Sequence, residues 1–175
     1  PVPFKAVVLN NATLPAENRE ELVAFQKEVS DMARVMMGTQ SMIRQEMVKA
    51  EAIQKALKLT PGASADQVLK ANSLARELED LMFILNGPSA QASWEELSPM
   101  TMPLNRRMNV MVYTHWSSSS GLTKTEQDQL AILKEEFPPV LEQLKDLAGE
   151  ISQLNAQLDA LKSPWTPGRT PKLLP

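Results

Sequence analysis

Few residues in this chain could carry chemistry. His115 is the only histidine and cysteine is absent, so a Ser-His-Asp relay or a histidine metal site would depend wholly on His115. Its neighbours Tyr113, Thr114 and Trp116 add no nucleophile signature. Carboxylate pairs such as Glu135-Glu136 point about 100° apart on a helix and do not share a site. The glycines are isolated, which excludes a phosphate-binding loop. We predict no catalytic residue, no metal ligand and no cofactor, and therefore no enzyme.

A surface for interaction is a second possibility. Arg106 and Arg107 beside tryptophans could stack on a sugar or a peptide, and a tyrosine and the histidine lie close by in sequence. The simpler interpretation is that these residues form an ordinary seam between helices. The candidate interaction residues are Trp94, Arg106, Arg107, Tyr113, His115 and Trp116.

The chain also contains ten methionines. Methionine side chains can form adaptable grooves for a partner. Met32, Met36, Met108 and Met111 fall instead on positions that should face inward, which favours filling of the core.

Composition narrows the class of protein. The chain of 175 residues has 18 basic and 21 acidic side chains, a net charge of −3, which gives no electrostatic reason to expect nucleic acid or an anionic membrane as a partner. The longest apolar runs, such as residues 81–85, are far shorter than the approximately 18 to 20 residues of a membrane span. Helix-forming residues dominate the middle of the chain, and the 13 prolines are clustered, so we predict an all-α protein.

The elements that must position these residues are long amphipathic helices. Residues 130–161 repeat apolar side chains in alternating steps of three and four, the pattern of one helix face. A capping box at Thr123-Lys124-Thr125-Glu126 opens this helix. Pro138 and Pro139 interrupt it, but the heptad phase continues past them, which favours one kinked helix. The stripe consists of Leu130, Leu133, Phe137, Val140, Leu144, Leu147, Ile151, Leu154, Leu158 and Leu161.

Three further helices are predicted upstream. The first should run from about residue 14 to about residue 58, capped near Thr13 with Pro15 in its first turn, and Thr39 and Glu46 break its apolar stripe. The second starts at Ser64, in a capping box with Gln67, and ends before Gly87. The third spans about residues 103–116, with Leu104, Met108, Met111 and His115 as its inward set.

These lengths predict an elongated antiparallel bundle. A helix of some 44 residues would be about 66 Å long, and short turns make neighbouring helices antiparallel. The second and third helices together match the length of the others, so we expect three rods with the middle rod broken in two. We divide the chain into an extended arm or linker over residues 1–12, the helical bundle over residues 13–162 and a non-helical, proline-rich tail over residues 163–175.

The order of landmarks resembles the C-terminal helical region of sortilin-like BNR-repeat proteins, which are glycosyl-hydrolase-like and carry this region after a large β-propeller. The resemblance rests on a strand-like segment at residues 4–9, the run Pro103-Leu104-Asn105-Arg106-Arg107, Leu122-Thr123, and Leu154-Asn155. Members of the family often have Asp-Pro-Arg where this chain has Leu9-Asn10-Asn11, and a proline where it has Leu122. No propeller Asp-box is present, so any hydrolase activity would belong to another domain.

Three functional hypotheses follow. The first is a non-catalytic structural or interaction module whose partner is a preceding domain of the same polypeptide or another protein; the resemblance implies an accessory domain of an exported, periplasmic or secreted protein. The Pro-Val-Pro start favours an excised fragment. The second is a site for a small ligand or carbohydrate at the break in the middle rod. The third is a self-assembling coiled coil, although the stripes within one chain suffice for a monomer.

Overall fold

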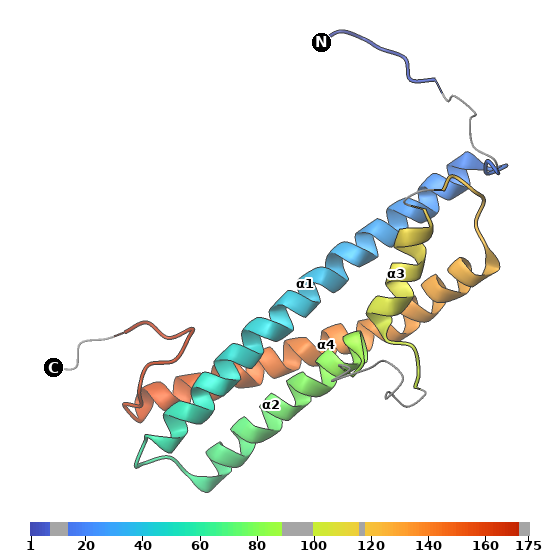
Figure 1. Ribbon diagram of the computed structural model, residues 1–175. Coiled ribbons are helices and arrows are strands. Elements are labelled where there is room, and N and C mark those ends of the chain that lie inside the picture. The colour runs from blue at the N-terminus through green and yellow to red at the C-terminus, as the bar shows by residue number, and fades with distance from the viewer. Residues whose placement is uncertain (8–13, 89–99, 116–117, 172–175) are drawn as a thin grey trace.

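The computed structural model describes residues 1–7, 14–88, 100–115 and 118–171. Within these residues the protein is all-α, with helices α1 (Arg19–Lys58), α2 (Ala65–Asn86), α3 (Leu104–Thr114) and α4 (Lys124–Ala160) and no strand. The predicted fold class is therefore confirmed. Residues 1–7, the described part of the predicted arm, are extended and exposed, and they project away from the helices (Figure 1).

The helices form an elongated bundle of three rods. α1 and α4 run along its whole length, while α2 and α3 follow one another along the third rod (Figure 1). Every pair of the four described helices is in contact. The turn between α1 and α2 lies at the same end as the tail that follows α4, and α3 ends near the start of α4.

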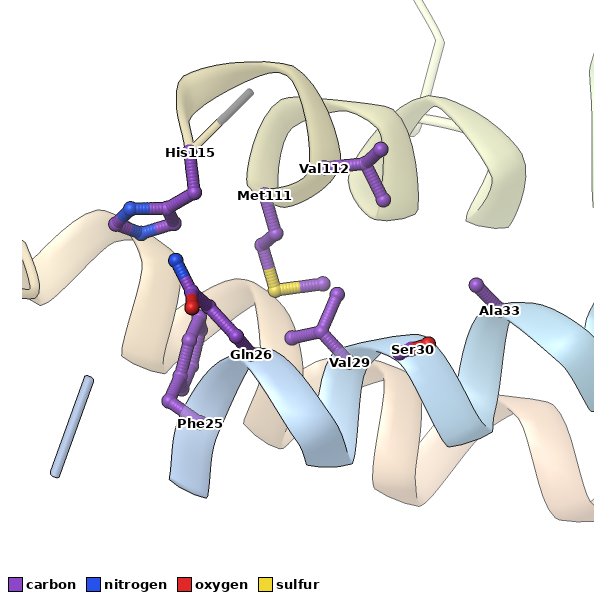
Figure 2. A pocket seen from close by; sticks show the side chains of 8 residues that line it. All are labelled: Phe25, Gln26, Val29, Ser30, Ala33, Met111, Val112 and His115. Atoms are coloured by element: carbon purple, nitrogen blue, oxygen red, sulfur yellow. The ribbon is translucent and has the colours of Figure 1, made fainter. Parts of the chain in front are cut away.

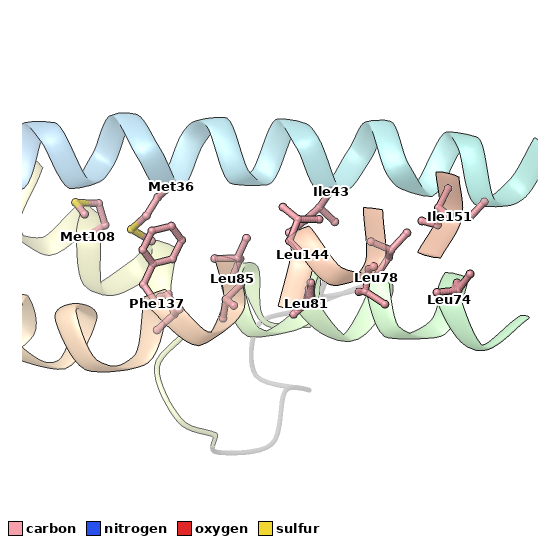
Figure 3. Close-up of a cluster of buried hydrophobic side chains, with 14 of the residues drawn as sticks. Met36, Ile43, Leu74, Leu78, Leu81, Leu85, Met108, Phe137, Leu144 and Ile151 are labelled. Atoms are coloured by element: carbon pink, nitrogen blue, oxygen red, sulfur yellow. The ribbon is translucent and has the colours of Figure 1, made fainter. Parts of the chain in front are cut away.

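A continuous apolar core runs along the axis of the bundle (Figure 3). Nine of the ten stripe positions predicted on α4 are buried, and only Leu161, at the C-terminal cap, is partly exposed. On α1 the two apparent breaks in the stripe are buried as well. The Thr39 hydroxyl donates to the carbonyl of Val35, and Glu46 Oε1 accepts from Lys49 Nζ at 2.7 Å. The buried face of α1 is thus continuous, although two of its positions carry polar side chains instead of apolar ones.

The helix starts follow local capping chemistry. Ser64 with Gln67 and Thr123 with Glu126 form both predicted capping boxes. The predicted start of the first helix is wrong by several residues, because Asn18 caps α1 through a bond from Glu21 N to its side chain. Pro15 lies before the helix. The Ala16 amide instead donates to the carbonyl of Ser119 at 2.8 Å, which ties this segment to the loop before α4.

Hydrogen bonds connect the end of α2 with the start of α3 across the break in the middle rod. Asn86, the last residue of α2, accepts from Gln40 on α1 at 3.1 Å and from Asn105 on α3 at 2.7 Å. Gly87 follows at φ +72°, and a Cβ there would lie 2.7 Å from Pro103 Cγ. Only glycine meets both conditions without strain. The two half-rods therefore meet through a fixed junction.

Pro138 and Pro139 lie inside one uninterrupted α4. Both are exposed, whereas Phe137 and Val140 beside them are buried. The carbonyls that lose their helical partners belong to Lys134 and Glu135 on the exposed side, where water can satisfy them. The prediction of one helix rather than two is confirmed.

Residues 163–171, the described part of the predicted tail, are non-helical, and part of this segment packs against α4. Asn155 on α4 is buried, donates to the carbonyl of Pro167 at 2.9 Å and accepts from the fully buried Thr166 hydroxyl. Arg169 donates to the carbonyls of Ser163 and Pro164. Together these bonds fold the segment back onto the end of α4, and we call residues 163–169 the C-terminal clasp.

Candidate functional site

The candidate site is an open groove between α1 and α3, close to the N-terminal end of α1. Its volume is about 380 Å³. Figure 2 shows the side chains of both helices facing one another across it, with the imidazole of His115 at one end. The lining residues are Phe25, Gln26, Val29, Ser30, Ala33, Met111, Val112 and His115.

Helical periodicity explains why these residues share a groove. The α1 members are spaced one, four, five and eight residues from Phe25, so they occupy one face over two turns. Met111, Val112 and His115 do the same on α3. Val29 and Met111 are buried and form the floor, while Ala33 is small and Ser30 is exposed. The hollow exists because short side chains on α1 leave the space beside α3 unfilled.

His115 and Glu126 form a buried pair behind one end of the groove. Their side chains are 6% and 2% exposed, and His115 Nε2 lies 2.7 Å from Glu126 Oε1, although the contact lacks hydrogen-bond alignment. The other carboxylate oxygen accepts from the amide and hydroxyl of Thr123, both at 2.8 Å. One glutamate therefore caps α4 and holds the residue at the end of α3. The Phe25 ring meets the imidazole edge-on, with centroids 6.1 Å apart.

The predicted interaction residues take separate places. Arg107 reaches α4, where it donates to Gln129 at 2.9 Å. Arg106 is exposed, and Tyr113 is 64% exposed. His115 is buried against Glu126. Trp94 and Trp116 lie outside the described residues. Of the four candidates that the structure describes, His115 alone lines the groove.

Two groups in this region escaped the sequence reasoning. The first is Glu126, which was assigned only to a capping box; it also lies four residues before Leu130 and so continues the apolar stripe of α4, a signal that it would be buried. The second is the α1 half of the groove, where Ser30 and Ala33 carry no motif. Met111 was predicted to fill the core; it is buried as expected and also forms part of the groove floor.

The chemistry available here is hydrogen bonding and apolar contact. Across the part of the chain that the structure describes, no group of three or more His, Asp or Glu side chains could hold a metal ion. No described helix combines the length and apolar character that a membrane span requires. The comparisons with known proteins found no matching family model, no matching curated protein and no matching solved structure.

Proposed function

We propose that this chain is a non-catalytic interaction module: a rigid helical bundle that joins a partner domain through its N-terminal arm. The main support is that the bundle buries its apolar side chains, whereas the N-terminal arm exposes its own. The bundle covers its own apolar stripes within one chain. In the arm, Val2, Phe4 and Val7 are 88%, 92% and 72% exposed, although side chains of this kind gain roughly 1.5 to 3 kcal/mol each on burial.

The arm suits the edge of a β-sheet. In an extended chain successive residues direct their backbone groups to opposite edges, so the amides of Val2, Phe4 and Ala6 share one edge. Pro3 lacks an N–H on the other edge. One edge can therefore pair with a strand of the partner, as in strand addition to an exposed sheet. Pro3 prevents a further strand from pairing fully with the other edge.

The resemblance supplies a specific partner. A region of this kind follows an Asp-box β-propeller in sortilin-like BNR-repeat proteins. A propeller keeps only short sheet edges, and on this proposal the arm pairs with one of them. On this proposal the bundle is an accessory C-terminal domain of an exported protein, and any hydrolase activity belongs to the propeller. The preceding domain of the same polypeptide is then the main partner.

Sequencing the reading frame that encodes this chain is the first test. An Asp-box propeller upstream supports the proposal, and a start codon directly before Pro1 overturns the propeller assignment. Hydrogen exchange then tests the arm in the protein that the frame encodes. We expect the amides of Phe4 and Ala6 to be protected, and Phe4→Asp to remove that protection while α1–α4 keep theirs. Unprotected arm amides in the wild-type protein contradict the docking.

Self-assembly is the alternative interaction. Because the stripes of α1, α2 and α4 are buried against one another within one chain, we propose a monomer. Sedimentation should give one species of about the chain mass over a hundred-fold range of concentration. A mass that rises with concentration would favour a coiled coil between chains.

A further inference from the structure

We infer that the groove between α1 and α3 binds a small aromatic molecule that carries a hydroxyl group, with the aromatic body on the apolar wall and the hydroxyl at His115. This groove lies between α1 and α3, whereas the predicted ligand site lies at the break in the middle rod. It is independent of the proposed docking of the arm, since no residue of the arm lines the groove.

The size and lining of the groove suit a small aromatic ring system. Its volume of about 380 Å³ falls in the range of roughly 300 to 1,000 Å³ typical of small-molecule sites. Five of its eight lining residues are apolar, and they form a continuous wall from Phe25 to Ala33 on one side and Met111 to Val112 on the other. Phe25 and Met111 offer the ring and sulfur contacts that aromatic ligands favour.

The polar end of the groove has an unmet hydrogen-bonding need. The His115 side chain is 6% exposed, Nε2 faces Glu126 without an aligned hydrogen bond, and Nδ1 has no hydrogen-bond partner among the residues that the structure describes. A buried polar atom without a partner costs about 1 to 3 kcal/mol, so a ligand group that reaches it contributes to affinity. A hydroxyl meets the need in either state of the ring, because it donates to a neutral Nδ1 and accepts from a protonated one.

Gln26 stands at the entrance to this end. In Figure 2 its amide group points toward the imidazole of His115, and the residue is only half-buried. A rotation of this long side chain would uncover the ring without moving either helix. The same amide can then bond the other side of the ligand hydroxyl, since it carries both a donor and an acceptor.

The test uses the single histidine as its own reporter. Because His115 is the only histidine, both imidazole ¹⁵N signals come from this residue, and their couplings to the ring protons distinguish Nδ1 from Nε2. We expect 2-naphthol, titrated into the full chain, to shift the Nδ1 signal with saturation. The apolar match 2-methylnaphthalene should bind about five-fold more weakly, the ratio that one net hydrogen bond contributes, and should leave Nδ1 nearly unchanged.

Two variants distinguish binding in the groove from nonspecific binding elsewhere on the surface. Ala33→Leu fills the hollow and should weaken 2-naphthol binding at least ten-fold, while Ala24→Leu, at an exposed position of the same helix, should bind like the wild type. Circular dichroism confirms that both variants fold. Gln26→Leu removes the second hydroxyl contact and should narrow the difference between the two probes. An unshifted Nδ1 signal at saturating 2-naphthol, equal affinities for both probes, or unchanged binding by Ala33→Leu would overturn the inference.

Discussion

Replacing Glu126 by alanine should destabilise the bundle far more than any ordinary surface change. The carboxylate accepts two bonds from Thr123, at 2.8 Å each, and lies 2.7 Å from His115 Nε2. Two lost bonds at about 1 kcal/mol each, plus about 1 to 3 kcal/mol for withdrawing the carboxylate that faces the buried imidazole, give about 3 to 5 kcal/mol. For a domain of this size that corresponds to a fall in Tm of about 6 to 20 °C.

Urea unfolding of Glu126→Ala, followed by circular dichroism, measures this loss as a lower midpoint at an unchanged slope. Glu126→Gln should recover most of the stability, because glutamine also serves in a capping box. The control is Glu136→Ala, an exposed position on the same helix, which should change stability by less than about 0.5 kcal/mol. A double-mutant cycle with His115→Ala should show coupling between the pair of about 1 to 2 kcal/mol.

The reasoning is refuted if Glu126→Ala unfolds within about 0.5 kcal/mol of the wild type. A large loss without coupling to His115 would instead assign the whole effect to the cap of α4. In that case the contact between the ends of α3 and α4 would be incidental to stability.

Four further outcomes are expected. Small-angle scattering should give a radius of gyration of about 20 Å, since α1 is about 60 Å long, and not the roughly 16 Å of a compact chain. Leu133→Ala, at a position 0% exposed, should cost about 2 to 5 kcal/mol in chemical unfolding, whereas Leu69→Ala, 66% exposed, should cost under about 1 kcal/mol. Asn155→Ala should release the C-terminal clasp and expose its amides to rapid hydrogen exchange, and slow exchange in this variant would contradict the assigned bonds. The hydrogen bond and charge of Lys55 lower the pKa of Glu51. The small stabilisation from this ion pair is therefore lost as the pH falls through that lowered pKa. An NMR titration of Lys55→Met should find the Glu51 pKa closer to its ordinary value.

Much of the fold follows from local sequence, because helices are built from contacts between residues three and four apart. Short stretches of sequence were enough to predict the apolar stripe on α4, both capping boxes and the end of α2 before Gly87. Their lengths then predict the three rods. The start of α1 was missed because two caps competed: Thr13 with Pro15 had the stronger sequence signature, but Asn18 makes the observed bond to Glu21.

The tertiary structure decided which residues meet from different helices. Glu126 reads as a cap in the sequence, and only the approach of α3 to α4 makes it the partner of His115. The groove depends on Ser30 and Ala33 lying opposite Val112, residues about eighty positions apart that carry no motif. The clasp depends on Asn155, which meets Thr166 only because the chain turns back after Ser163. Periodicity fixes the face of a helix on which a residue lies, whereas the neighbour across that face depends on how whole helices pack.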